Sequence, residues 1–181
     1  RHSTKRVCFH QLAAPLPRGA FLEIAPGVAV CSPELVFVQL AETLPMGELI
    51  ALGYEFCGCY PLEANRSGAL VRAQLTTPAR LSAFVNRVER MKGLRKARIA
   101  VQFVYAKSAS AKETEMDALL MTPMRWGGLS LPPALANEPV ALSEEAARIA
   151  RGDRVVCDLL WPQARVAAEY DGLAFHGGRH Q

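Results

Sequence analysis

The sequence predicts a mixed α/β chain that is mostly helical in its N-terminal part and carries a β-hairpin near its C-terminal end. Apolar residues recur at helical spacing in five stretches, and two β-like runs follow them. Half of the 181 residues are apolar and 21% are charged. This composition is typical of a globular protein and excludes wholesale disorder.

The five helices are expected over 33–44, 46–52, 78–91, 94–104 and 110–121. Ser32-Pro33 and Thr77-Pro78 each place a capping hydroxyl before a proline, which favours the first turn of a helix. Gly93 separates the third helix from the fourth, and Ser110 opens the fifth with the spacing of a capping box. Residues 54–60 fit either a strand or a loop.

Charge and composition divide the chain into three parts. Residues 1–76 form a mixed α/β module of unknown role, 77–109 a basic helical connector, and 110–181 a second α/β part. Residues 79–107 hold eight basic side chains and one acidic side chain. Such an excess attracts phosphates, although it is also typical of a solvated helix surface. The expected nucleic-acid contacts are Arg87, Arg95, Lys96 and Arg98.

The five cysteines point to reduced thiols rather than to a metal site. Their number is odd, no secretion signal is visible at the first residues, and a cytoplasmic location is therefore expected. Cys57 and Cys59 are the only close pair, and their spacing is shorter than structural zinc sites use. No apolar run reaches the length of a membrane helix, so no membrane partner is expected.

The β-like runs 154–161 and 165–171 carry acidic residues that would meet in a hairpin. If the turn is centred between Gln163 and Ala164, paired residue numbers sum to 327, and Asp158 lies directly opposite Glu169. Two like charges at this position destabilise a sheet that its apolar residues predict to be buried. Three arrangements would compensate for this: a divalent cation, a basic partner such as Arg165, or a protonated carboxyl.

These residues resemble the PD-(D/E)XK nuclease superfamily, and most closely its very-short-patch-repair-like branch. The resemblance is carried by Asp158-Leu-Leu-Trp-Pro, Glu169-Tyr-Asp171-Gly172, His176 and the upstream Ser110-Ala-Lys-Glu113, and it covers about residues 94–181. It implies a restriction-endonuclease-like α/β core over 110–181. This core would be incomplete at Gln181, because the fold normally continues past the histidine. The N-terminal module looks like one that precedes such nucleases in bacterial defence proteins.

The resemblance also implies roles for single residues. Asp158 and Glu169 would bind Mg²⁺ or Mn²⁺, with Glu113 as a helper and His176 as a general acid/base or phosphate contact. Two plainer readings stay open, since Glu113 also fits a helix cap and His176 a loop. Asp171 would be a further acid at the site, although it stands where the superfamily has a lysine, and with Gly172 it also fits a turn that ends the strand.

Three functions follow as expectations. The first is a metal-dependent endonuclease that hydrolyses DNA in bacterial defence or repair. The second is a non-catalytic DNA-binding regulator, of antitoxin type, that keeps a nuclease-like fold. The third is a protein-interaction subunit of a defence system. The expected partners are nucleic acid, most simply DNA, and either a second copy of the chain or another defence protein.

Overall fold

The computed structural model describes residues 15–58, 74–105 and 110–170, and its helices and small antiparallel sheets agree with the expected α/β class. A hairpin of β1 (Phe21–Ala25) and β2 (Val28–Cys31) comes first. A helical bundle follows it. The bundle is formed by α1 (Pro33–Leu40), α2 (Met46–Cys57), α3 (Pro78–Arg87) and α4 (Leu94–Ala100), with the 3₁₀ turn η1 (Val101–Phe103) after α4.

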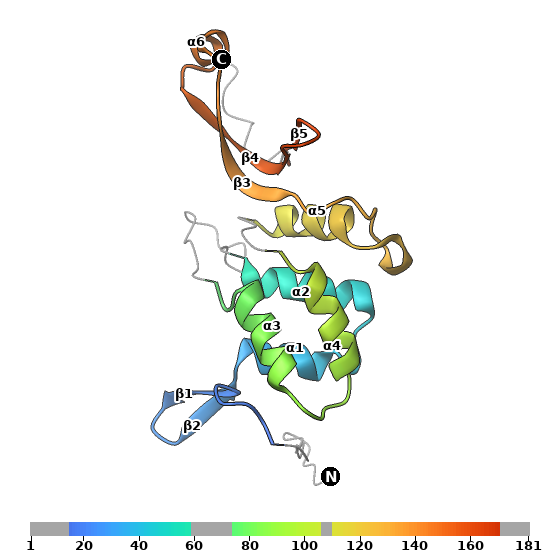
Figure 1. Ribbon diagram of the computed structural model, residues 1–181. Coiled ribbons are helices and arrows are strands. Elements are labelled where there is room, and N and C mark those ends of the chain that lie inside the picture. The colour runs from blue at the N-terminus through green and yellow to red at the C-terminus, as the bar shows by residue number, and fades with distance from the viewer. Residues whose placement is uncertain (1–14, 59–73, 106–109, 171–181) are drawn as a thin grey trace.

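The C-terminal part lies on the α2 side of this bundle, as Figure 1 shows. It begins with α5 (Ala111–Met121), which packs on α2, and continues through the 3₁₀ turn η2 (Met124–Trp126). The chain then forms β3 (Leu135–Ala141), α6 (Glu144–Ala150), β4 (Arg154–Trp161) and β5 (Val166–Ala168). The three strands pair antiparallel in the order β3-β4-β5. The hairpin of β1 and β2 lies at the opposite end of the molecule, beside α1 (Figure 1).

The expected helix starts are confirmed by their capping hydrogen bonds. The Ser32 hydroxyl accepts from the Leu35 amide at 3.2 Å, and the Thr77 hydroxyl accepts from the Arg80 amide at the same distance. Ser110 accepts from the amide of Glu113 at 3.1 Å. Each of these bonds satisfies an N–H group that has no partner within the first helical turn.

The helix α2 extends through residues 54–57, where the sequence left a strand or a loop open. Its buried side includes Ile50, Gly53, Tyr54 and Cys57, which is helical spacing. Gly53 conceals this pattern in the sequence because it supplies no apolar side chain. Its place is explained by close packing, since a Cβ atom there would lie 2.4 Å from Val104 Cγ2.

One hydrophobic core joins the helical bundle to the C-terminal part. It contains Phe37, Leu49 and Leu81 from the bundle together with Leu159 and Trp161 from β4. Residues 78–100, which the sequence assigns to a basic connector, supply α3 and α4, and both helices pack on α1. None of the helices in the described ranges has the length and hydropathy that a membrane span requires.

The sequence missed three elements. The β1–β2 hairpin turns at Pro26-Gly27, where Gly27 has a φ of 73°. Strand β3 and helix α6 fill the stretch before β4, and Ser143 caps α6 by accepting from the Ala146 amide. Most side chains of these elements are exposed, so they lack the apolar periodicity on which the predictions relied.

Candidate carboxylate site

The predicted register of the C-terminal hairpin is confirmed. Leu159 pairs with Ala168, Leu160 with Ala167 and Trp161 with Val166. Each pair of numbers sums to 327, so the next position along the ladder places Asp158 opposite Glu169. Strand β5 ends at Ala168, immediately before that position.

Asn137 extends this row across the sheet. On β3, Ala136 pairs with Leu159 and Glu138 with Cys157, so Asn137 stands opposite Asp158. Its φ of 51° lies in the left-handed region, which asparagine tolerates better than most residues. Three polar residues, Asn137, Asp158 and Glu169, therefore occupy the same level of β3, β4 and the end of β5.

Helix α5 brings two further carboxylates to this part of the sheet. Glu113 and Asp117 are four residues apart, so they lie on one side of the helix. The Asn137 amide donates to Glu113 Oε2 at 3.2 Å and ties the helix to β3. Glu113 thus contributes its backbone to the helix cap and its side chain to the contact with the sheet, and its role as a metal helper stays a prediction.

Asp117 is the most perturbed acid in the described part of the chain. Its side chain is buried, with 2% exposed, and it forms no ion pair with any described residue. Burial, together with the nearby carboxylates of Glu113 and Asp158, raises the pKa of Asp117 to about 7. Asp117 therefore marks the place where the charges of α5 and β4 come close together.

Tyr54 connects this acidic group to the helical bundle. Its ring lies in the core, and its buried hydroxyl has no hydrogen-bond partner that meets ordinary geometry among the described residues. Burial raises the pKa of Tyr54, and the nearby Asp117 carboxylate raises it as well. The contact between α2 and α5 therefore places a buried hydroxyl next to the buried acid.

The charge of Asp158 is stabilised by a local hydrogen bond, in which the Tyr170 amide donates to Asp158 Oδ2 at 2.7 Å. Burial and the nearby Glu169 carboxylate raise the pKa of the Cys157 thiol. The pleat no longer fixes the direction of Glu169 because β5 has already ended, so its carboxylate reaches a neighbour of Asp158 on β4.

The hairpin is also less buried than the sequence predicts. Cys157, Leu159 and Trp161 are buried, whereas Val156 and Val166 are about half exposed, at 55% and 50%. Asp158 lies on the more open side of β4, where its side chain is only partly buried. The electrostatic cost of its charge is therefore smaller than a fully buried hairpin would impose.

The side chains around Asp117 are donors of the kind that a hard metal ion prefers, although among the residues that the structure describes their positions do not form a metal site. Carboxylate and amide oxygens are the ligands that Mg²⁺ prefers, and Glu113, Asp117, Asn137 and Asp158 supply them. Within the described ranges, however, no three acidic, histidine or cysteine side chains stand in positions that would hold an ion together. Asp171 and His176, which the resemblance also assigns to the site, lie outside the described residues.

The expected nucleic-acid contacts separate into two kinds. Lys96 Nζ donates to the Leu44 carbonyl at 2.7 Å, and Arg98 Nη2 donates to the Val88 carbonyl at 2.9 Å. Arg87 lies over the Phe84 ring at 5.9 Å from its centre, and Arg95 is exposed. Two of the four residues therefore hold the backbone of their own chain.

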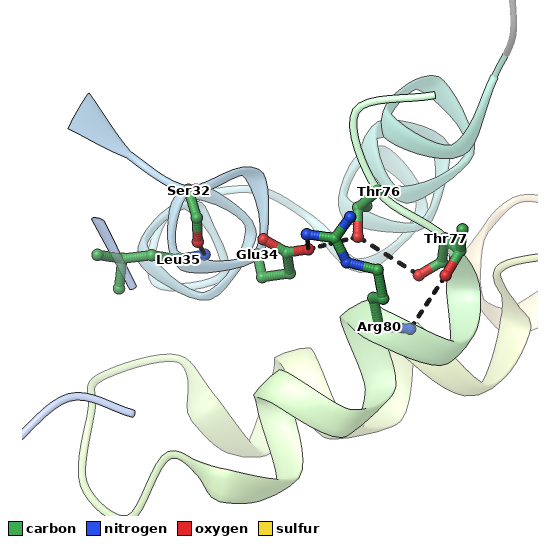
Figure 2. Close-up of polar contacts among 6 residues, drawn as sticks. All are labelled: Ser32, Glu34, Leu35, Thr76, Thr77 and Arg80. Atoms are coloured by element: carbon green, nitrogen blue, oxygen red, sulfur yellow. Dashed lines mark hydrogen bonds and ion pairs between the residues drawn. The ribbon is translucent and has the colours of Figure 1, made fainter. Parts of the chain in front are cut away.

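A second buried carboxylate, Glu34, has a different character (Figure 2). The Thr76 hydroxyl donates to Glu34 Oε1, and Arg80 Nη2 lies 3.4 Å from the same oxygen. These contacts join the start of α1 to the start of α3. Glu34 is thus paired on both sides and has a structural role, in contrast to Asp117.

Sequence reasoning missed Asp117 and Tyr54. The spacing of Glu113 and Asp117 on one helix side was visible, but nothing in the sequence placed that side against β4. Comparison with known proteins adds no relative: no protein-family model, no curated protein and no solved structure matches the chain.

Proposed function

We propose that this chain belongs to a divalent-cation-dependent endonuclease that hydrolyses DNA phosphodiester bonds. One observation supports the proposal most directly. The carboxylates of Glu113 on α5 and Asp158 on β4 lie close enough to Asp117 to raise its pKa. Asp158 is also the residue that the strand register places opposite Glu169. Acidic side chains such as Asp158 and Glu169, next to the end of β5, are suitable ligands for a hard cation. Such a cation polarises a phosphate and activates water.

Asp158 and Glu169 are the proposed ligands of Mg²⁺ or Mn²⁺, with Glu113 as a helper. The Glu169 carboxylate, which lies close enough to Cys157 to raise the pKa of its thiol, would have to rotate to reach the ion. Such a rotation is open to it because Glu169 follows the end of β5 and is exposed. His176 and Asp171 complete the proposed set, in the restriction-endonuclease-like core that the sequence resembles.

The second candidate is a DNA-binding regulator that keeps this fold without catalysis. It is favoured by the hydrogen bond that already engages Asp158, because such a contact stabilises the hairpin without an ion. The two functions make opposite predictions for a single substitution.

Asp158→Asn separates them. Asparagine keeps an oxygen that accepts from the Tyr170 amide, so the backbone contact survives while the negative charge is lost. For the endonuclease we expect cleavage of a DNA duplex in Mg²⁺ to disappear in the variant. The folded state should be equally or more stable, because the charge near Asp117 is removed.

Thermal melts with and without Mg²⁺ provide the second readout. A bound ion stabilises the folded state by about 2.7 kcal/mol when it is present at one hundred times its dissociation constant. Wild type should show this response and Asp158→Asn should not. Asp153→Asn removes an acid from an exposed position just before β4 and serves as the matched control. A wild type that neither cleaves DNA nor responds to Mg²⁺ or Mn²⁺ contradicts the endonuclease.

A further inference from the structure

The turn that connects α3 to α4 has a concentrated positive charge. Residues 87–98 contain six basic side chains and one acid, Glu89. Lys92 is the member that is neutralised by an ion pair, since its Nζ lies 3.2 Å from Glu42 Oε1. Arg87, Arg90 and Arg95 are exposed, and they form no ion pair with any residue in the described ranges.

The remaining two basic residues fix the shape of this turn. Arg98 Nη2 binds the carbonyl of Val88, which caps the C-terminal end of α3. Lys96 Nζ binds the carbonyl of Leu44, just before α2. Gly93, with a φ of 78°, lets the chain turn into α4, and a Cβ atom there would lie 2.4 Å from the Glu42 amide nitrogen. Arg87 at the end of α3, Arg90 in the turn and Arg95 at the start of α4 are free of ion pairs with the described residues, and the backbone that presents them is held from both sides.

This surface lies away from the carboxylate site. In Figure 1 the turn between α3 and α4 is at one end of the bundle, and α5 with the β3–β4 pair is at the other. Basic side chains at this end cannot guide a phosphate onto the carboxylates of the same chain at short range. Any role of these side chains in binding phosphate is therefore separate from the carboxylate site.

The composition of the turn favours a phosphate backbone as its partner. Guanidinium groups bind phosphate oxygens in a two-pronged geometry, and all three free residues are arginines. No large apolar side chain between Leu75 and Leu119 is exposed among the described residues. Membrane-surface segments and protein interfaces both rely on such side chains, so the turn fits neither of them well.

We propose that the α3–α4 turn is a nucleic-acid-binding surface separate from the carboxylate site, on which Arg87, Arg90 and Arg95 contact backbone phosphates. Lys96 and Arg98 position the turn and do not need to contact the nucleic acid. The surface binds nucleic acid without reading its sequence, because phosphate contacts carry no base information. The proposal does not depend on cleavage by the chain.

The test measures binding of the full chain to a short duplex DNA by fluorescence anisotropy, in EDTA and at several salt concentrations. Each lost phosphate contact lowers the slope of log Kobs against log salt by about 0.9. Replacing Arg87, Arg90 and Arg95 together by glutamine should lower the slope by up to about three such steps, and by the same amount for unrelated duplex sequences.

A control variant replaces Arg148, Arg151 and Arg154 by glutamine, which removes the same charge from exposed positions in and after α6. Its slope should match the wild type. Thermal melts establish that both variants fold, and the double variant of Arg90 and Arg95 replaces the triple variant if the latter is unstable. In that double variant the slope of log Kobs against log salt should fall by about two phosphate contacts, or about 1.8.

Four results would overturn the proposal. They are a wild type that does not bind duplex DNA at about 50 mM salt, an unchanged slope in the triple variant, an equal loss in the control, and binding only to vesicles of anionic lipid. Because EDTA prevents metal-dependent cleavage, binding and cleavage are tested independently. A chain that cannot cut DNA can still pass this test, and a chain that cuts DNA can still fail it.

Discussion

Replacing Asp117 with asparagine should change how the stability of the fold depends on pH. Asp117 is buried beside the charges of Glu113 and Asp158, and its pKa rises from an ordinary value of 3.8 to about 7. The folded protein therefore holds a proton that the unfolded chain has already released in this range. By linkage, the free energy of unfolding falls as the pH rises from about 4 to about 7, and it changes no further above that.

The size of the effect follows from the shift. One pKa unit corresponds to about 1.4 kcal/mol, so a shift of about three units costs the folded state at most about 4 kcal/mol at high pH. This is an upper limit, because water that reaches the carboxyl screens its charge. Asparagine resembles the protonated acid in shape and does not ionise, so the variant should escape this cost.

Urea unfolding at about pH 5 and about pH 8 measures both proteins. Between these values the shift covers about two pKa units, so we expect the free energy of unfolding of Asp117→Asn to rise by about 1–3 kcal/mol relative to wild type. Titrating groups that Asp117 does not influence cancel in this difference. Glu115 lies on the exposed side of α5 and is paired with Lys112, so Glu115→Gln is the matched control. Its free energy of unfolding relative to wild type should change by less than about 0.5 kcal/mol between the two pH values.

A difference that stays constant between the two pH values would refute the reasoning. It would mean that Asp117 ionises in the folded state as easily as in the unfolded chain. The carboxylates of α5 and β4 would then not be coupled, and the observation that carries the proposed cation site would be lost.

Two further substitutions test the packing of the bundle. Thr76→Val removes the hydroxyl that donates to the buried Glu34, and it should lower the free energy of unfolding by about 1–3 kcal/mol in urea. Thr43→Val, at an exposed site, is the control and should lower it by less than about 0.5 kcal/mol. Equal losses in the two variants would contradict the structural role of Glu34. Gly53→Ala should lower the free energy of unfolding by about 1–3 kcal/mol despite the better helix propensity of alanine, because the new methyl group meets Val104 and Phe37. Gly152→Ala, which has no neighbour closer than 3.8 Å, is its control, and a Gly53→Ala variant as stable as wild type would contradict this packing.

Local features of the sequence determined the helix starts and the hairpin register. Ser32, Thr77 and Ser110 cap their helices as predicted, since a cap depends only on residues within one turn. The hairpin register followed from two β-like runs and a short connection, and it placed Asp158 opposite Glu169 before any contact was known. The metal, the DNA substrate and the roles of these acids remain predictions.

Only the tertiary structure decided which distant residues meet. Asp117 became prominent because α5 packs between α2 and the sheet, which buries its carboxyl near Tyr54 and Asp158. The interpretation of the basic residues 87–98 also changed because of tertiary contacts. Lys96 and Arg98 reach carbonyl groups of other segments, and their turn lies at the far end of the bundle from the carboxylates. Periodicity and charge counts report on neighbours along the chain, whereas burial and coupling between charges depend on distances in space that only the packed helices and strands establish.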